Sequence, residues 1–554
     1  MENTTSNSVL FSSLSWGLHE FAASSFVSVQ STLLVLCLFV SLFIVKAKGR
    51  TRGINKQKPA LPPGPTPWPI IGNIPEIFSR KNKPNFRWIH GLMKELNTDI
   101  ACIKLASTHV IPVTSPEIAR EFLRKYDSVF ASRPITMATE YSSRGFLTIA
   151  VVPLGDQWRK MRKVVASEMV TPARLRWLLG KRNEEADNLV RFIYNQCESN
   201  GGSSAVIDMR LAIRQYTGNV IRKMMFNRRN FGEGRKDGGP GREEVEHVES
   251  LFTVLNHLYS FALSDYIPWL RPLDLEGHEK IVSEAMRIIS GYNDPIVNER
   301  VKEWKDGKRK EPEDLLDALI LAKDVEGKPV LSVEEIKAQC TEIMFATVDN
   351  PANAVEWAMA EMLNRPEIIR KATEEIERVV GNQRWVQESD IPRLNYVKAC
   401  ARESLRLHPV APFNLPHVSN ADCVVAGYFI PKGSHVLLSR IGLGRNPKVW
   451  DKPLVFEPER HFKDGGSDEE IDLTETELKF LSFSTGRRAC MGVALGSAMT
   501  VMLLARLVQG FSWRVPPNEA EIDLSESKND LFLAKPLHAM ATPRLPAYEL
   551  YSPY

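Results

Sequence analysis

The motif FSTGRRACMG near the C-terminus contains the residues best suited to chemistry in this sequence. A lone cysteine, Cys490, stands just ahead of an apolar run rich in Ala, Leu and Met, which is typical of a helix. The N-terminus of a helix stabilises negative charge and so favours the thiolate, the form of cysteine that binds metal ions. Gly486 permits a tight turn under a flat cofactor, Phe483 can pack near the sulfur, and Arg488 can pair with an acidic substituent. The pattern predicts a thiolate bound to iron; the alternative is a buried structural cysteine.

A second chemical signal is the segment FATVDNPANAVEWAM, in which a proline interrupts a helical pattern. Pro351 has no N–H, so the carbonyl of Thr347 cannot receive its helical hydrogen bond and needs another partner, such as ordered water. An acid and an amide, Asp349 and Asn350, stand directly before the proline. We interpret the defect as a wet notch beside proton-handling side chains; the alternative is a helix kinked for packing alone.

Two further pairs of residues have helical spacing. Glu403 and Arg406 are three residues apart, and Trp158 and Arg162 are one turn apart in DQWRKMRK. An exposed Glu–Arg pair adds little to stability, and an amphipathic basic helix would explain the second pair. Neither pair is specific on its own.

A mainly helical domain with small β-sheets is expected to position these residues. Strand-like runs occur in IACIKLASTHVIPVT and SHVLLS, and helical periodicity is clear over residues 242–262, 276–306, 332–364, 366–380 and 394–407. In the third of these helices, Ser332 and Glu335 form a capping box. The charged, glycine-rich segment 232–244 reads as a surface loop, so residues 70–554 are predicted to form one catalytic domain.

The N-terminal region differs from the rest of the chain. Residues 21–45 carry no charge and are apolar enough to cross a bilayer, and six basic residues follow directly. By the positive-inside rule, residues 1–20 face the lumen and the body stays in the cytosol. The basic, proline-rich segment 46–69 is a stiff lead-in, and the apolar Trp68 and Ile70 at its end are expected to be buried. The alternative, a cleaved signal peptide, would need a basic start that the sequence lacks.

Composition excludes several classes of function. The chain of 554 residues has 71 basic and 67 acidic side chains, and this balance gives no reason to expect a nucleic-acid partner. The seven cysteines are scattered, odd in number and without a C-x-x-C pair. A disulfide framework or a zinc site is therefore not expected.

The cysteine motif, the E-x-x-R pair and the tryptophan–arginine pair together resemble a cytochrome P-450, a haem-thiolate monooxygenase. The resemblance implies the P-450 fold and a haem b (iron protoporphyrin IX) whose iron is held by Cys490, with Phe483 and Arg488 in the haem loop. It also implies that Trp158 and Arg162 contact the haem propionates. His417 of FNLPHVS stands where many relatives have an arginine and is expected to contact a propionate as well.

The resemblance assigns roles to two other groups of residues. Arg460 of EPERH is expected to complete a buried structural cluster with Glu403 and Arg406. In the central helix, Asn350 stands where the family has a threonine that helps to deliver protons to bound dioxygen. Asp349 would orient this proton network, and the freed carbonyl of Thr347 would bind its water.

The N-P pair, the segment P-E-R-H and the stretch HPVAPFNLPHV resemble the plant amino-acid N-monooxygenases, over nearly the whole catalytic body. Members hydroxylate the amino nitrogen of an amino acid twice, and loss of water and carbon dioxide then gives an aldoxime. The resemblance implies action on L-phenylalanine to give phenylacetaldoxime, on the way to glucosinolates or cyanogenic glucosides; tyrosine, tryptophan and aliphatic amino acids are alternative substrates. It implies dioxygen as co-substrate, electrons from NADPH through NADPH–cytochrome P-450 reductase, and single-pass anchoring in the endoplasmic reticulum membrane.

Family position also suggests the substrate pocket: Phe345, Ala346, Phe413, Phe532 and the loop 136–150. Arg144 is the candidate cation for the substrate carboxylate, with an exposed loop arginine as the alternative. Ala489 stands where these relatives usually have glycine, so a positive φ there would strain the haem loop. Two rival functions are a haem-thiolate isomerase or dehydratase that needs neither dioxygen nor reductase, and a membrane haem sensor without turnover.

Overall fold

The computed structural model describes residues 59–78, 84–201, 204–462, 470–545 and 550–551. The backbone divides into two compact units, residues 1–60 and residues 61–554, and nearly all described residues belong to the second. The predicted membrane-crossing segment 21–45 and the basic residues after it lie outside the described residues.

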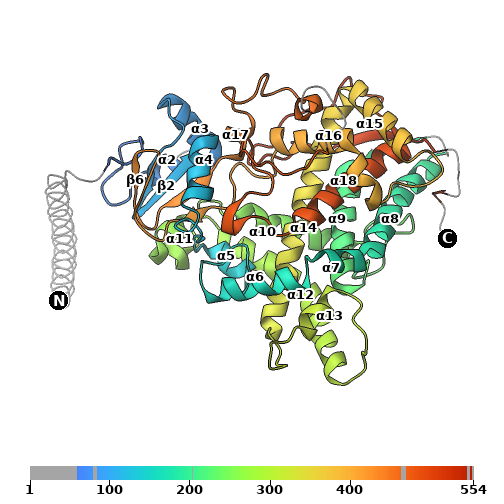
Figure 1. The fold of residues 1–554 in the computed structure, drawn as a ribbon, viewed down its shortest axis with the longest axis horizontal. Helices are drawn as coiled ribbons and strands as arrows, with labels where there is room; N and C mark the ends of the chain where they lie inside the picture. The colour runs from blue at the N-terminus through green and yellow to red at the C-terminus, as the bar shows by residue number, and fades with distance from the viewer. Residues whose placement is uncertain (1–58, 79–83, 202–203, 463–469, 546–549, 552–554) are drawn as a thin grey trace, which may run out of the picture. The chain divides into compact units, whose positions relative to one another are not determined.

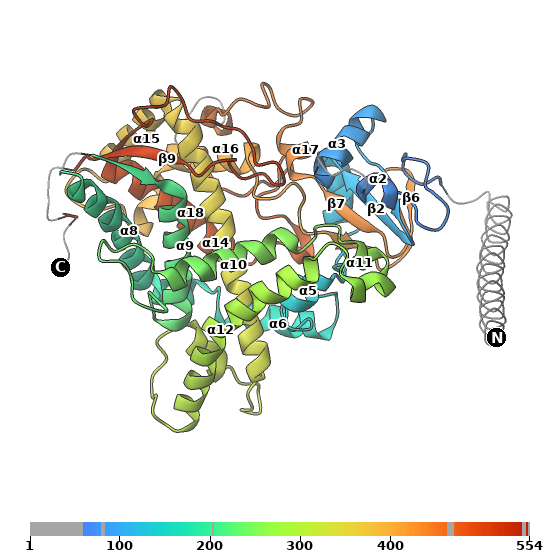
Figure 2. The ribbon, with the colours of Figure 1, turned by 180° about the vertical axis from the view of Figure 1, so that it is seen from behind.

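The second unit is mainly helical, as predicted (Figures 1 and 2). The α-helices are α2 (Ile74–Phe78), α3 (Asn85–Glu95), α4 (Pro116–Arg120), α5 (Met137–Ser142), α6 (Asp156–Glu168), α7 (Pro172–Trp177), α8 (Leu179–Ser199), α9 (Met209–Phe226), α10 (Arg242–His257), α11 (Leu263–Tyr266), α12 (His278–Lys305), α13 (Leu315–Leu321), α14 (Val333–Leu363), α15 (Pro366–Val379), α16 (Asn395–Leu407), α17 (Arg440–Gly444) and α18 (Val493–Gly510). Short helical segments of other pitch are η1 (Glu121–Lys125), η2 (Pro268–Leu273), η3 (Glu388–Arg393), η4 (Pro458–His461) and η5 (Gly486–Arg488).

The strands form small sheets at the edges of this helical body. They are β1 (Ile103–Leu105), β2 (Thr108–Val113), β3 (Ala205–Asp208), β4 (His417–Val418), β5 (Cys423–Val425), β6 (Tyr428–Ile430), β7 (His435–Leu438), β8 (Phe511–Arg514) and β9 (His538–Pro543). The sheet that matters for the site has the order β1-β2-β7-β4 and includes both predicted strand regions. Its central pair, β2 and β7, is parallel, with Val113 opposite Leu438, and β4 runs antiparallel to β7.

Helix α14 crosses the middle of the unit (Figure 2). The predicted capping box is confirmed: the Ser332 hydroxyl accepts from the N–H of Glu335, and the Glu335 carboxylate accepts from the N–H of Ser332. Nearly every side chain of α14 is buried, because the helix packs against α9, α12, α16 and α18. The helix continues through Pro351 to Leu363, so the defect lies inside a rigid, buried element.

Helix α18, which begins just after Cys490, is apolar on every side. Within the part of the chain that the structure describes, it alone is long and apolar enough to cross a membrane, but 67% of it is buried among other helices. It is therefore a core helix, which packs against α14, α15 and α16 and is buried from Met499 to Gly510.

Three predictions need correction. Trp68 and Ile70 are 57% and 60% exposed, because the chain around them forms a tight turn closed by a bridge between Trp68 and Gly72. Helix α10 ends at His257 rather than at residue 262, and the chain then turns so that Leu258 and Tyr259 line the central cavity. The segment 232–244 is a loop only as far as Gly241.

Candidate active site

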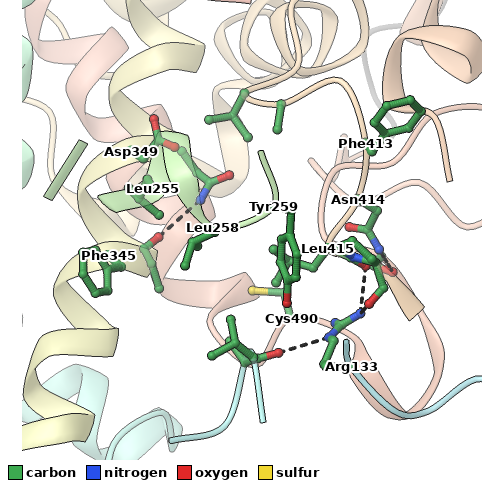
Figure 3. A pocket seen from close by; sticks show the side chains of 18 of the residues that line it. Arg133, Leu255, Leu258, Tyr259, Phe345, Asp349, Phe413, Asn414, Leu415 and Cys490 are labelled. Carbon is green, nitrogen blue, oxygen red and sulfur yellow. Dashed lines mark hydrogen bonds between the residues drawn. The ribbon is translucent and has the colours of Figure 1, made fainter. Parts of the chain in front are cut away.

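Cys490 lies in a short loop between η5 and α18 whose shape is fixed by local bonds. Its N–H donates to the carbonyl of Phe483 over 2.9 Å. Gly486 has a φ of 78°, and a Cβ there would lie 2.5 Å from the carbonyl oxygen of Leu123, so both conformation and space require glycine. The side chain of Cys490 is exposed, but only toward the interior of a cavity (Figure 3).

Ala489 does not strain this loop. Its φ is −56° and its ψ is 147°, an ordinary extended conformation for any residue. The condition under which alanine would strain the loop, a positive φ, is therefore not met, and alanine is compatible with the loop as it stands.

The pKa of the Cys490 thiol is raised, which corrects the prediction of a lowered value. Burial raises the pKa, and this effect outweighs the lowering by the backbone N–H of Gly492 and by the charge of Arg440. The helix N-terminus alone is thus insufficient to make the thiolate. A coordinated metal ion deprotonates a thiol outright, so an iron at this sulfur would supply the missing stabilisation.

The cavity above Cys490 has a volume of about 950 Å³. Figure 3 shows the sulfur at its centre, with Asp349 and Phe345 of α14 on one side and Phe413, Asn414 and Leu415 on the other. Most of the predicted site residues line it: Trp158, Arg162, Phe345, Ala346, Thr347, Asp349, Asn350, Phe413, Phe483, Arg488, Cys490 and Phe532. Arg144 and His417 do not.

A group of cations lies at one edge of the cavity. The guanidinium of Arg488 lies 4.7 Å from the ring centre of Trp158, and that of Arg162 lies 5.6 Å from it. Arg488 donates to three backbone carbonyls, those of Ala131, Ile149 and Val152. Among the described residues, Arg162 forms no hydrogen bond or ion pair, so its guanidinium is free to meet an acidic group.

These features fit a haem. The cavity offers one sulfur that opens into it, apolar walls, and a free guanidinium beside an indole ring for an acidic substituent. The other cysteines of the described chain are buried or half-buried and do not line the cavity. Cys490 is therefore the one described residue of its kind placed to hold the iron.

His417 lies behind the cavity wall rather than in it. Its Nδ1–H donates to the carbonyl of Phe130 over 2.8 Å, and its Nε2 lies 3.5 Å from the amide nitrogen of Asn414. Burial holds the pKa of His417 well below its usual value, so the imidazole is neutral. The structure gives no propionate-facing charge at this position.

Arg144 is committed elsewhere. Its guanidinium lies 2.5 Å from the carboxylate of Asp294 and 3.4 Å from that of Glu334, and it also donates to Ser290. These partners lie on α12 and α14, outside the cavity lining. The arrangement does not bring Arg144 to the substrate carboxylate.

The residues of α14 around Pro351 line the cavity and differ in polarity and exposure. Ala346 and Asn350, one turn apart on α14, are its accessible face, and the Asn350 amide donates to the Ala346 carbonyl over a long 3.4 Å. Asp349 is buried, and its Oδ1 has no partner in the described structure. Burial raises the pKa of Asp349 to about 7, although Arg214 and Arg440 act to lower it. Thr347 is buried beside them.

Aromatic side chains and a held loop form the rest of the wall. Phe413 stacks on His90 at 5.4 Å, and Phe532 meets Phe252 edge-on at 5.9 Å. The predicted loop 136–150 contributes lining residues and is held to α14 because Glu342 accepts from the N–H groups of residues 149 and 150.

Sequence reasoning missed several lining residues, among them Leu255, Leu258 and Tyr259, which Figure 3 labels. They lie where α10 ends and turns. A helical pattern that continues past residue 257 gave no signal for that turn.

Glu403, Arg406 and Arg460 form a buried cluster away from the cavity. The Oε1 of Glu403 lies 2.7 Å from Nη2 of Arg406 and 3.0 Å from Nε of Arg460. A partner that was not predicted, His461, lies 2.8 Å from Oε2. Despite burial, these donors lower the pKa of Glu403 to about 2. The cluster ties α16 to η4.

Comparison with known proteins relates the chain to a family. The family model described as Cytochrome P450 matches residues 62–542. Phenylalanine N-monooxygenase of Arabidopsis thaliana is 67% identical, over 90% of this chain and 94% of its own length. Tryptophan N-monooxygenase of Prunus mume is 59% identical over 93% of this chain and 96% of its own. Tyrosine N-monooxygenase of Sorghum bicolor is 57% identical over 88% and 87%.

Proposed function

The chain belongs to the cytochrome P450 family, and we propose that it is an amino-acid N-monooxygenase that converts L-phenylalanine to phenylacetaldoxime. The proposal extends to this chain the activity named for a relative with 67% identity over nearly its whole length. The observation that carries it is the cavity in which Cys490 faces an acid and an amide between aromatic walls. Such a cavity suits a substrate with an apolar ring and a polar reacting end.

Haem would be held by the sulfur of Cys490, with Phe483 packed near it and Trp158, Arg162 and Arg488 at its edge. When bound, haem supplies the activation of dioxygen, with electrons that come from NADPH through NADPH–cytochrome P-450 reductase. The neutral His417 adds no charge to this set.

The chain's own residues handle the protons. With a pKa of about 7, the Asp349 carboxyl can give up and regain a proton near neutral pH, from the oxygen that has no other partner. The Asn350 amide faces the cavity and can hold a water in place of a hydroxyl group. The carbonyl of Thr347, which has no helical donor at Pro351, offers that water a second anchor.

The aromatic walls orient the substrate and exclude bulk water. Phe345, Phe413 and Phe532 surround the space where a phenyl ring would lie, which leaves the amino group toward Cys490. Each N-hydroxylation consumes one dioxygen and two electrons and releases one water. Loss of carbon dioxide and a further water from the N,N-dihydroxylated amino acid gives the aldoxime.

We further propose that residues 21–45 anchor the protein in the endoplasmic reticulum membrane with the catalytic unit in the cytosol. The length and apolar character of this segment and the basic residues after it support the proposal. The same topology places the catalytic unit on the side where a membrane-bound reductase and NADPH are available.

The test is incubation of the membrane-bound protein, reductase and NADPH with each proteinogenic amino acid, followed by analysis for oximes. We expect phenylacetaldoxime from L-phenylalanine as the main product. An oxime from tyrosine, tryptophan or an aliphatic amino acid instead would change the substrate but keep the reaction. Product that forms equally well without NADPH and dioxygen would overturn the proposal in favour of an isomerase or dehydratase, and no product at all would favour a haem sensor.

A further inference from the structure

Three of the four arginines that line the cavity form one group at the haem edge. Arg133 and Arg488 each donate to three backbone carbonyls, and Arg162 lies beside Arg488 on the same tryptophan ring. Burial lowers the pKa of Arg488, and the neighbouring charges of Arg133 and Arg162 lower it further. The fourth, Arg440, begins α17, and its guanidinium donates to Asn414 rather than to the backbone carbonyls that this group contacts.

Arg440 is held at the place where the sheet meets the cavity. It follows β7 and begins α17, and its N–H donates to the carbonyl of Pro412 over 2.9 Å. A bridge between Ser439 and Phe413 fixes it next to the aromatic wall. The backbone of Arg440 is therefore rigid, and its side chain starts from beside Phe413.

The guanidinium of Arg440 is nearly without partners. Nη2 donates to the side-chain oxygen of Asn414 over 3.3 Å, and the buried Nε has no hydrogen-bond partner. Within the described ranges, no carboxylate lies at ion-pair distance from Arg440. A buried cation without a counter-ion is costly and is expected to meet an anion when the site is filled.

The charges that Arg440 does sense are those around the reacting centre. Burial raises the pKa of both the Asp349 carboxyl, on the α14 side of the cavity, and the Cys490 thiol, and the charge of Arg440 opposes this rise in each. Burial lowers the pKa of Arg440 itself to about 10, so it stays protonated at neutral pH. An amino acid has its carboxylate and amine on one carbon, so a cation that binds the carboxylate must lie close to the reacting nitrogen.

We propose that Arg440 binds the α-carboxylate of the amino-acid substrate and so places the amino group between Cys490 and Asp349. This inference rests on the proposed function. The anion that Arg440 meets is a carboxylate in either of two sources, the substrate or a haem propionate. The substrate is favoured because Arg440 follows the residue bridged to Phe413 and senses the charge of Asp349, and because it does not share the carbonyl partners of Arg133 and Arg488.

The test compares L-phenylalanine with 2-phenylethylamine, which keeps the ring and the amine but lacks the carboxylate. Binding to full-length holoenzyme is measured by the change in the haem absorption spectrum on titration. For Arg440→Met, we expect affinity for phenylalanine to fall roughly 30-fold or more, since truncation leaves a buried carboxylate unpaired. Affinity for 2-phenylethylamine should change by less than about threefold, and Arg440→Lys should show a smaller loss for phenylalanine alone.

Arg214→Met is the matched control. Arg214 also lowers the pKa of Asp349, but it stacks on Phe252 at 3.8 Å and does not line the central cavity. If the Arg440 effect acted through Asp349, the Arg214 variant would show the same loss of preference for phenylalanine. We expect its preference for phenylalanine over 2-phenylethylamine to match the wild type.

Two outcomes would overturn the inference. One is an unchanged preference in Arg440→Met at normal haem content. The other is loss of haem or of the carbon-monoxide spectrum in that variant at normal protein level, which would assign Arg440 to a propionate. If Arg440→Met does not accumulate, Arg440→Lys provides the test: a loss of affinity for phenylalanine but not for 2-phenylethylamine supports the inference, and an unchanged preference overturns it. Wild-type protein that forms no oxime would instead defeat the proposed function, so the two failures are distinguishable.

Discussion

At the scale of single residues, Asp349 has an ionisable group matched to its proposed task. A carboxyl that titrates at about 7 rather than 3.8 is half protonated under cytosolic conditions. Burial sets this value against the charges of Arg214 on α9 and Arg440 on α17, while Asp530 raises it further. The protonated carboxyl can donate its proton to a group in the cavity, and the ionised carboxylate can then take up another proton.

Replacing Asp349 by asparagine should remove this donor while keeping the shape of the side chain. We expect oxime formation to fall by roughly 10²–10⁴-fold, as for loss of a positioned acid–base group, while NADPH is still consumed. The wild-type rate should fall as pH rises through about 7, because the protonated form is the donor. That limb should be absent in the variant, as measured by oxime formed per NADPH across pH 6–9.

Stability supplies the control for this prediction. The folded state holds the Asp349 proton between pH 3.8 and about 7, where the unfolded state has lost it, so the group's contribution to stability falls as pH rises across that range. Asp349→Asn removes this cost, so the free energy of unfolding at pH 8 should rise by on the order of 2–4 kcal/mol, which is measured as a higher Tm. A lower Tm at pH 8 would show that the variant lost activity through unfolding.

At the scale of elements, α14 keeps a proline in a buried helix without interruption of the helix. The Thr347 carbonyl is thereby left without its helical donor at the level of Asp349 and Asn350. A second helix, α12, also contains an internal proline, Pro295, but this residue is exposed and does not line the cavity. Substitution of Pro295 therefore tests what loss of a helical proline does to stability alone, whereas substitution of Pro351 also changes the site.

Pro351→Ala should restore the backbone donor and close the proposed water site. We expect stability to rise or stay level, by up to about 3 kcal/mol, because a proline defect is removed from a helix interior. Oxime formed per NADPH should fall, since protons arrive less directly. Pro295→Ala should change stability in the same direction and leave this ratio at the wild-type value. Equal ratios in both variants would mean that Pro351 serves packing alone.

The ion cluster between α16 and η4 is a second element-scale feature. Glu403→Gln removes the carboxylate that Arg406, Arg460 and His461 contact, and it leaves the fully buried Arg406 without a counter-ion. We expect a loss of about 3–5 kcal/mol of stability, measured as a lower Tm and faster loss of haem on heating. The contribution of Glu403 should also vanish as pH falls through about 2, since its pKa is lowered.

The exposed pair Glu284–Arg287 on α12 provides the comparison for Glu403. Both side chains are more than half exposed, so Glu284→Gln should leave the Tm close to the wild-type value. Similar losses in the two variants would show that burial of the Glu403 cluster carries no special weight.

At the scale of the whole molecule, sequence patterns predicted the features that depend on residues close together in the chain. The capping box of α14 and the helices α10, α12, α14, α15 and α16 follow from residue type and spacing, apart from the last turn expected of α10. Arg144 and Arg440 show what sequence patterns do not predict. Arg144 forms an ion pair with Asp294, which is 150 positions away in the chain. That the guanidinium of Arg440 has few partners becomes clear only when the partners of the other cavity arginines are known. Trp68 shows another limit, because apolar character alone does not tell on which side of a turn a residue lies.

The backbone divides at residue 60, between the part that contains the uncharged segment 21–45 and the catalytic unit. The unit from Leu61 to Tyr554 is compact by itself and contains the cavity, the Cys490 loop and the Glu403 cluster, so removal of residues 1–60 should leave haem binding and the carbon-monoxide spectrum unchanged. The uncharged segment 21–45 is lost with them, so alkaline washing should release the shortened protein from membranes but not the full chain. Oxime formation with membrane-bound reductase should fall because the two partners no longer share a surface, whereas phenylalanine affinity should not change. Loss of haem from the shortened protein would show instead that residues 1–60 belong to the catalytic fold.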